Sequence, residues 1–189
     1  MSYVLRHNPA RYGLQPDRHG YVDLDAFFLI AKRRYPGVEA ERLHALIEAD
    51  HSGRFEVAGR LLRARYGHSI PADPPSAPVE PPQRLYHGTV AEHVKSIRTH
   101  GLRPIDRRMI HLSETIDDAV AVARRKTDQP VVFCINARDA SAAGILFYQE
   151  AKIFLASYIP ASFVRLEPLP AFSAPPHLAA PDAPPAPGV

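Results

Sequence analysis

Arginines and histidines gather at four points of the sequence, beside one another or beside small hydroxylated residues. The four clusters are Arg6-His7, Arg63 to Ser69, His87-Gly88-Thr89 and Arg107 to Ser113. A guanidinium suits a phosphate because its planar fork donates two parallel charge-assisted hydrogen bonds. An arginine next to a histidine can also grip one tetrahedral anion. Singly, each cluster is as well explained by surface arginines or structural histidines. Together they indicate chemistry on a phosphate-bearing substrate.

The cluster around His87 has the pattern of a strand that ends in a turn. Leu85 and Tyr86 predict the end of a buried strand, and His87-Gly88-Thr89 predicts the turn. An apolar series at helical spacing follows: Val90, Val94, Ile97 and Leu102. Gly88 has no Cβ, so a flat ring could approach the backbone closely. We therefore expect this turn to present a histidine and a hydroxyl to a small ligand.

Two further clusters fall on predicted strands. Strand alternation sends Arg63 and Arg65 to the same face. Arg107 and Arg108 form a basic loop that enters a strand carrying His111. Either group of arginines could contact an anion from the substrate.

The first 70 residues predict helices followed by a β-hairpin. A short helix should end before Asn8-Pro9, because a residue that precedes proline avoids the helical conformation. The other expected elements are a helix from Leu24 to Tyr35 capped by Asp23, with Leu24, Phe27, Phe28 and Ala31 inward, a helix from Glu39 to Asp50 with Leu43, Leu46 and Ile47 inward, and strands Arg54–Val57 and Leu61–Arg65. This order suggests a winged-helix lobe over residues 1–70, a shape often used on nucleic acids.

The rest of the chain predicts a linker, a second lobe and a tail. Residues 71–82 hold six prolines and predict an extended linker rather than a core element. Residues 83–167 are richer in strands, and residues 168–189 predict a disordered Pro/Ala-rich tail. The strands expected in the second lobe are Leu85–His87, Ile110–Leu112, Val131–Asn136, Lys152–Leu155 and Phe163–Leu166, with one helix that ends at His100-Gly101 and another that begins at Thr115. The fold class is therefore α+β.

Composition narrows the class of protein. The only cysteine, Cys134, lies in an apolar run and excludes a disulfide framework. No apolar run approaches the length of a membrane span, and no signal-peptide pattern is present. The charge surplus lies in the first 70 residues, with 11 Lys/Arg against 8 Asp/Glu. This surplus hints at an anionic partner for the N-terminal part, although an excess this small is usually only a solvated surface. We expect a cytoplasmic monomer.

The order of the motifs resembles the NAD-dependent RNA 2′-phosphotransferase family of tRNA splicing. The motifs are Leu-Arg-His-Asn-Pro, Arg-Ala-x-x-Gly-His-Ser, Tyr-His-Gly-Thr and Arg-x-x-Ile-His-Leu-Ser, and the resemblance spans roughly residues 2–166. The resemblance implies an N-terminal winged-helix lobe and a C-terminal ADP-ribosyltransferase lobe. It also implies transfer of an RNA 2′-phosphate to NAD through a 2′-phospho-ADP-ribosylated RNA.

The resemblance assigns roles to residues. The catalytic tetrad that surrounds the 2′-phosphate falls on Arg6, His7, Arg63 and Arg107. The NAD-binding residues fall on His87, Gly88, Thr89, His111, Ser113 and Ile153, with Ile153 as a hydrophobic third triad position. His68 and Ser69 would border the RNA substrate. Arg107 rather than Arg108 has the family's spacing, four residues before His111.

The chain departs from the family's pattern at three points. Several helical residues usually precede Leu-Arg-His, Tyr66 replaces a common glutamine, and the usual Asn-Gly turn near Lys152 is missing. No histidine–carboxylate set has metal-ligand spacing, so we expect no metal, because arginines can neutralise the phosphate charge. Two alternatives stay open. One is ADP-ribosylation of a nucleic-acid phosphate end or a small molecule, and the other is a non-catalytic winged-helix nucleic-acid binder.

Overall fold

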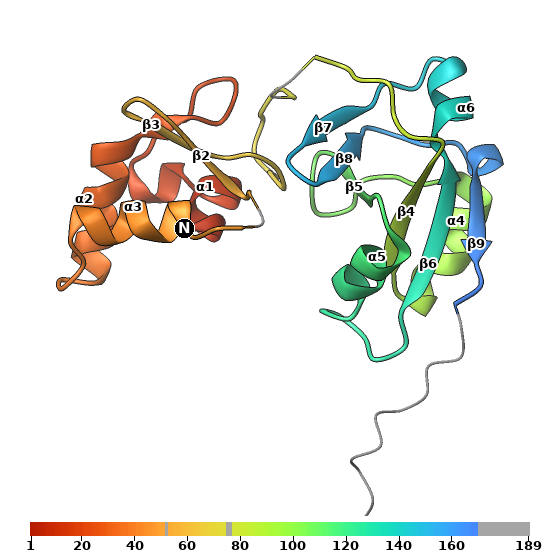
Figure 1. Ribbon diagram of the computed structural model, residues 1–189. Helices are drawn as coiled ribbons and strands as arrows, with labels where there is room; N and C mark the ends of the chain where they lie inside the picture. Colours follow the sequence, from red (N-terminus) through yellow and green to blue (C-terminus); the bar gives the residue numbers. More distant parts are fainter. Residues whose placement is uncertain (52, 75–76, 170–189) are drawn as a thin grey trace, which may run out of the picture.

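The chain folds around two antiparallel β-sheets, each covered by its own helices (Figure 1). The computed structural model describes residues 1–51, 53–74 and 77–169. In this part of the chain, one sheet has the strand order β1-β3-β2 and the other β7-β8-β5-β4-β6-β9. The mixed α and β architecture is confirmed. The winged-helix and ADP-ribosyltransferase assignments stay predictions.

The N-terminal unit, which runs from α1 to β3, surrounds the smaller sheet. Its elements are α1 (Ser2–His7), η1 (Ala10–Tyr12), β1 (Val22–Asp23), α2 (Leu24–Arg34), α3 (Ala40–Glu48), β2 (Phe55–Ala58) and β3 (Leu61–Ala64). The predicted cap of α2 is confirmed, because the Asp23 side chain accepts the Ala26 N–H at 2.8 Å. Leu43 is buried as expected, but Leu46 is 53% exposed. The expectation that Leu46 faces inward is wrong, because only the Leu43 side of α3 meets the core.

The tight hairpin β2–β3 sets which side chains lie opposite each other. Ala58 pairs with Leu61 across Gly59 and Arg60, and this register places Glu56 directly opposite Arg63. Gly59 has φ +60°, a left-handed conformation that favours glycine. Strand β1, which the sequence did not predict, pairs with the other edge of β3.

The proline-rich segment 71–82 is partly built into the fold. Val79 forms a β-bridge with Phe147 and packs against the larger core, and Pro81 is fully buried. The expectation of a linker without core contacts therefore fails at its C-terminal end. Apolar contact of proline rings needs no backbone donor, so prolines can pack there.

The C-terminal unit, which runs from β4 to β9, contains the six-stranded sheet. Its elements are β4 (Arg84–Thr89), η2 (Ala91–His93), α4 (Val94–His100), β5 (Ile110–Ser113), α5 (Ile116–Ala123), β6 (Val131–Asn136), α6 (Ala137–Ala142), β7 (Tyr148–Glu150), β8 (Ile153–Ala156), η3 (Ala161–Phe163) and β9 (Val164–Glu167). Helices α4 and α6 share one core with Leu85 and Phe133. Helix α5 packs on the other face, against Val132 and Tyr86 (Figure 1).

Strand β4 is longer than the sequence predicts. His87, Gly88 and Thr89 do not form a turn but pair with Phe133, Val132 and Val131 of β6. The chain leaves the strand only at Val90, where η2 follows. A glycine is an unreliable sign of a turn here, because Gly88 serves packing. A Cβ at this position would lie 1.8 Å from the backbone oxygen of Ala119 in α5.

Helix boundaries in the C-terminal unit follow the expected caps. The Thr115 side chain accepts the Asp118 N–H at 3.1 Å, and Gly101 ends α4 with φ +75°. Cys134 is fully buried, as predicted. Strand β7 and helix α6 were not predicted. No described helix is both long and apolar enough to cross a membrane.

Candidate active site

Several of the residues predicted to do chemistry lie where the N-terminal and C-terminal units touch, and we call this region the seam. The backbone N–H of Arg108 donates to the His68 oxygen at 3.0 Å, so segment 65–69 lies directly against the loop before β5. The rings of Tyr66 and His111 approach to 5.9 Å between centroids. A cavity of about 30 Å³ lies here, lined from the two units by Arg65, Tyr66, Gly67, His68, Ala72, Asp73, Pro74, Arg108, Met109, His111 and Leu155.

Arg6 lies in this seam with unused hydrogen-bond donors. It comes from the last turn of α1, and its guanidinium stands 5.1 Å above the centre of the Tyr66 ring. Its Nε and Nη2 are buried and have no hydrogen-bond partner among the described residues. Burial lowers the pKa of Arg6, and the nearby charge of Arg107 lowers it further, against the opposing effect of Tyr66. A buried cation beside a second cation favours an anionic ligand.

His7 and Ser69 are brought together beside Arg6. Nδ1 of His7 and Oγ of Ser69 form a hydrogen bond of 3.0 Å, although the residues are 62 positions apart. The Ser69 N–H also donates to the backbone oxygen of Arg6 at 3.0 Å, which ties this segment to α1. Burial, then the charges of Arg6 and Arg107, lower the pKa of His7. The imidazole is therefore neutral near pH 7 until an anion arrives.

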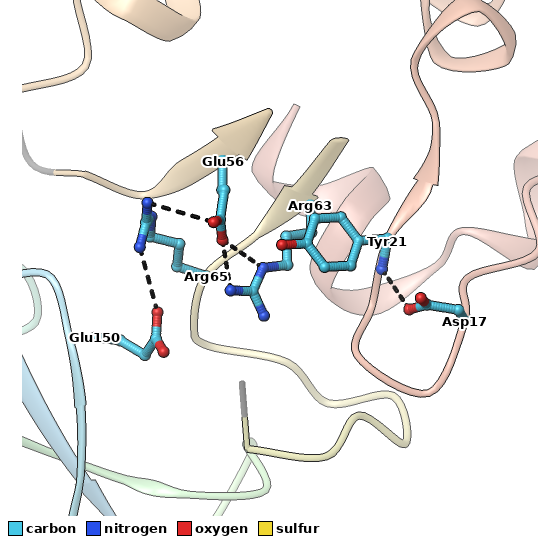
Figure 2. A network of polar contacts seen from close by, with 6 residues as sticks. All are labelled: Asp17, Tyr21, Glu56, Arg63, Arg65 and Glu150. Carbon is cyan, nitrogen blue, oxygen red and sulfur yellow. Dashed lines mark hydrogen bonds and ion pairs between the residues drawn. The ribbon is translucent and has the colours of Figure 1, made fainter. Parts of the chain in front are cut away.

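Arg63, on β3, lies near enough to His68 to lower the pKa of that histidine, as Arg6 does, but it is already paired. It is 6% exposed, and Glu56 Oε2 accepts hydrogen bonds from its Nε at 2.7 Å and its Nη2 at 2.5 Å. Its guanidinium also covers the Tyr21 ring at 4.6 Å (Figure 2). This pairing gives Arg63 a fixed orientation, whereas Arg6 keeps its donors open.

Two buried histidines of the seam are neutral. Burial lowers the pKa of His68 to about 4, with further lowering by Arg6, Arg63 and His7. Burial lowers the pKa of His111 to about 3, with Arg107 as the next cause. The His111 ring N–H at Nδ1 donates to the Met109 oxygen at 3.1 Å, so its Nε2 is a bare acceptor. This buried Nε2 has no partner among the described residues, and neither does that of His68.

The residues assigned to NAD lie on three neighbouring strands of the larger sheet. The His87 ring N–H at Nδ1 donates to the backbone oxygen of His111 at 3.0 Å, and burial lowers the pKa of His87. Ser113 on β5 pairs with Ile153 on β8. Thr89 bonds His93 Nδ1 at 3.0 Å. These residues therefore lie on adjacent strands of one sheet, and their binding of NAD stays a prediction.

At Gly88, the space where a Cβ would stand is occupied by the protein itself. We expected its missing Cβ to admit a flat ligand, but the group that approaches it is the backbone of α5 at Ala119. The expectation that the missing Cβ makes room for a flat ligand is therefore wrong.

Sequence reasoning missed three residues that shape the site. Glu56 and Tyr21 hold Arg63, and the ring of Tyr66 lies between Arg6 and His111. A signal for Glu56 existed, because a two-residue hairpin turn places it opposite Arg63. Tyr66 gave no comparable signal. Among the residues that the structure describes, no group of three or more His, Cys, Asp and Glu side chains could hold a metal ion.

Comparison with known proteins finds one family model and several relatives of the same name, which match most of this chain. The family model described as RNA 2′-phosphotransferase, Tpt1/KptA family, matches residues 1–156. A protein of Acetivibrio thermocellus named "Probable RNA 2′-phosphotransferase" is 38% identical over 170 residues, which cover 88% of this chain and 93% of the relative. Proteins of the same name from Pyrococcus horikoshii and Methanosarcina mazei are each 38% identical, over 137 and 165 residues. The matches cover 72% and 87% of this chain and 77% and 79% of the relatives.

Proposed function

Because this chain belongs to the RNA 2′-phosphotransferase family, we propose that it removes an internal 2′-phosphate from RNA by transferring it to NAD. The observation that carries the proposal is the Arg6 guanidinium, whose buried Nε and Nη2 have no hydrogen-bond partner among the described residues, beside Arg107 and His7. A 2′-phosphate is a dianion with three oxygens, so it can accept hydrogen bonds from both units at once.

The seam also offers a place for a sugar. His111 is neutral, and its Nε2 is a buried acceptor that no described residue bonds. A ribose hydroxyl is a matching donor. We assign NAD to the group formed by His87, Gly88, Thr89, His111, Ser113 and Ile153, next to the proposed phosphate site. A hydrophobic Ile153 fits because an anionic phosphate nucleophile needs no carboxylate base.

The proposed reaction has two steps. In the first, a 2′-phosphate oxygen bonds to the anomeric carbon of the nicotinamide ribose, and the bond to the nicotinamide nitrogen breaks. In the second, the adjacent ribose 2″-oxygen bonds to phosphorus, and the bond from phosphorus to the RNA 2′-oxygen breaks. The proton of the 2″-hydroxyl is released, and the RNA 2′-oxygen gains one. The products are 2′-OH RNA, ADP-ribose 1″,2″-cyclic phosphate and nicotinamide.

The residues of the tetrad have separate tasks in these steps. Arg6 and Arg107 orient the phosphate and neutralise its charge, and Arg63 aids them from the Glu56-bound position. An incoming dianion raises the pKa of His7, so the imidazole takes up a proton that it can give to the leaving 2′-oxygen. No step in this scheme calls for a metal ion.

Mass analysis of both products tests the proposal. A short RNA with one internal 2′-phosphate is incubated with NAD and excess chelator, and the same RNA with a 2′-hydroxyl is the control. We expect the cyclic phosphate and 2′-OH RNA only from the phosphorylated RNA. ADP-ribose that stays on the RNA would instead support an ADP-ribosyltransferase that stops after the first step. Binding without consumption of NAD would support a non-catalytic nucleic-acid binder.

A further inference from the structure

Glu150 places a buried carboxylate at the seam between the two units. It ends β7 in the C-terminal unit and is only 4% exposed. A carboxylate is seldom buried unless an opposite charge accompanies it, because desolvation disfavours the ion. One charge that accompanies Glu150, that of Arg65, comes from the N-terminal unit.

Arg65 spans a carboxylate of each unit. Its Nη1 lies 3.7 Å from Oε2 of Glu150, and its Nη2 lies 3.7 Å from Oε1 of Glu56 (Figure 2). These distances exceed those of hydrogen bonds, so charge attraction rather than a directed bond holds the three groups. The Arg65 side chain is 34% exposed, so solvent screens this attraction only in part.

The same carboxylate of Glu56 orients Arg63. Its Oε2 accepts two hydrogen bonds from Arg63, while its Oε1 faces Arg65. The four side chains therefore form a row of alternating charge that starts in the C-terminal unit and ends at Arg63. A movement of Glu150 relative to Arg65 would therefore change, through Glu56, the position of Arg63, which we propose to bind the phosphate.

A second contact supports this docking point. A Cβ built on Gly53 would lie 2.9 Å from Cβ of Ala151, the residue after Glu150. The backbone of the loop before β2 thus contacts the Ala151 side chain in the β7–β8 turn. The units meet at this end as well as at the Arg108–His68 hydrogen bond.

We propose that Arg65 and Glu150 are positioning residues that dock the two units and thereby align Arg63 with Arg6 and Arg107 for one phosphate. This inference rests on the proposed function for its kinetic consequence, but not for its structural one. Neither residue belongs to the groups that we propose to hold the phosphate or NAD. Loss of the pair should leave NAD binding intact, because every residue assigned to NAD lies in the C-terminal unit.

The test compares Arg65→Met, Arg65→Lys and Glu150→Gln with the wild type and with Arg60→Met. Arg60 pairs with Asp25 on the surface, where the side chains are 80% and 63% exposed, so it is a matched ion-pair control away from the seam. We expect R65M and E150Q to lower kcat for 2′-phosphorylated RNA by roughly tenfold or more, because a misplacement of ~1 Å can cost ~10²-fold. The KM for NAD should stay within about twofold of the wild type.

Small-angle scattering gives a readout that does not need activity. R65M and E150Q should increase the radius of gyration in solution, whereas R65K and R60M should not, since charge rather than a hydrogen-bond fork carries the contact. R65K should also keep kcat within about threefold of the wild type. If R65M fails to fold, the nearly isosteric E150Q provides the same test.

Each outcome decides something. An unchanged radius and kcat in R65M and E150Q would overturn the inference. Equal damage from R65K and R65M would show that packing rather than charge matters, which also overturns it. If the wild type never consumes NAD with this RNA, the proposed function fails, while the radius of gyration still decides the docking role.

Discussion

Arg6 and Arg63 carry the same charge in opposite surroundings, and this contrast bears on how the proposed site would bind and release a phosphate. Arg6 has two buried donor atoms with no partner in the part of the chain that the structure describes, so an anion gains hydrogen bonds there at no loss of existing ones. Arg63 is bound to Glu56, so a phosphate must share it with a carboxylate. Sharing weakens the hold on the ground state. Arg63 can then interact more strongly with the transition state, where negative charge increases, than with the ground state. This difference in binding is what accelerates a reaction.

This contrast predicts which step depends on which arginine. During the second step negative charge gathers on the equatorial oxygens of phosphorus, and loss of one donor aimed there costs ~10²–10³ in rate. We expect Arg63→Ala and Arg107→Ala to slow the second step more than the first. The 2′-phospho-ADP-ribosylated RNA should then accumulate, which a gel shift over time will detect.

Arg42→Ala, on the exposed side of α3, is the matched control and should show no accumulation. Variants of Arg63 and Arg107 that are inactive in the first step, with no intermediate at any time, would make these arginines a binding clamp instead. His7→Ala should resemble Arg63→Ala if its imidazole protonates the leaving oxygen.

Glu56 gives a residue-scale prediction about pH. Its burial would raise the pKa of the carboxyl, but hydrogen bonds from Arg63 and the charges of Arg63 and Arg65 lower it below the ordinary 4.5. A lowered folded pKa adds stability that is full above the unfolded value and is lost as pH falls through the folded value. Glu56→Gln should lower the free energy of unfolding by about 1–3 kcal/mol at neutral pH.

The difference between the wild type and E56Q should shrink as the pH drops below 4.5. Thermal melts across that range measure it, with Glu41→Gln on exposed α3 as a control that should track the wild type. A difference that is constant at all pH values would mean that the Glu56 charge does not stabilise the fold.

At the scale of elements, local signals predicted boundaries well and contacts poorly. Asp23 and Thr115 cap helices as expected, because capping involves only residues two or three apart. The strand at Gly88 was misread, because the need for a glycine there comes from α5, some 30 residues later in the chain. Strand β7 has three residues and α6 has no side-chain cap, so neither leaves a strong pattern.

The packing of α5 on β4 predicts the effect of a single methyl group at Gly88. Because an added Cβ would lie 1.8 Å from a backbone oxygen that cannot rotate away, Gly88→Ala must push α5 off the sheet. We expect a loss of about 1–3 kcal/mol or more in the free energy of unfolding, measured by chemical denaturation.

Gly37→Ala is the control for this substitution, since no atom lies within 4 Å of its added Cβ. Wild-type stability in G88A would show that α5 and β4 pack less closely than described. NAD-dependent activity in a folded G88A protein would separate the packing role of this glycine from any role in binding.

The β7–β8 turn carries strain that a substitution can relieve. Ala151 has φ +53°, and a left-handed conformation costs an L-residue roughly 1–2 kcal/mol. Ala151→Gly should therefore raise the free energy of unfolding by about 1 kcal/mol.

The matched substitution Ala45→Gly, in exposed α3, should have the opposite sign and cost about 1 kcal/mol. Equal destabilisation by A151G and A45G would show that the turn is not strained. Melting temperatures of both variants beside the wild type provide the comparison.

At the scale of the whole molecule, the sequence predicted what the site contains but not how the units are held together. The order of the motifs predicted that Arg6, His7, His68 and His111 belong to one site, and the structure places all four in the seam. Glu150 could not be found in that way, because its partner Arg65 lies 85 positions earlier and in another unit. Such a long-range ion pair leaves no periodic or local trace in one sequence.

The chain after Leu169 provides the last prediction. Leu169 packs against the α5 cluster of Ala119 and Val120, and residues 170–189 lie outside the described residues. Eight prolines and six alanines stand between Pro168 and Val189, a composition from which we predict no part in the site. Deletion of residues 170–189 should therefore leave turnover within about twofold.

The truncation point makes the experiment selective. A protein that ends at Leu169 keeps the contact with α5, whereas Leu169→Ala in the full chain removes it. We expect the truncated protein to melt with the wild type, and L169A to lose about 1–2 kcal/mol of stability, since its side chain packs on the cluster from a partly exposed position. A collapse of turnover in the truncated protein, with its melting temperature unchanged, would mean that the Pro/Ala-rich stretch takes part in binding RNA or NAD. That result would assign a function to residues for which composition predicts none.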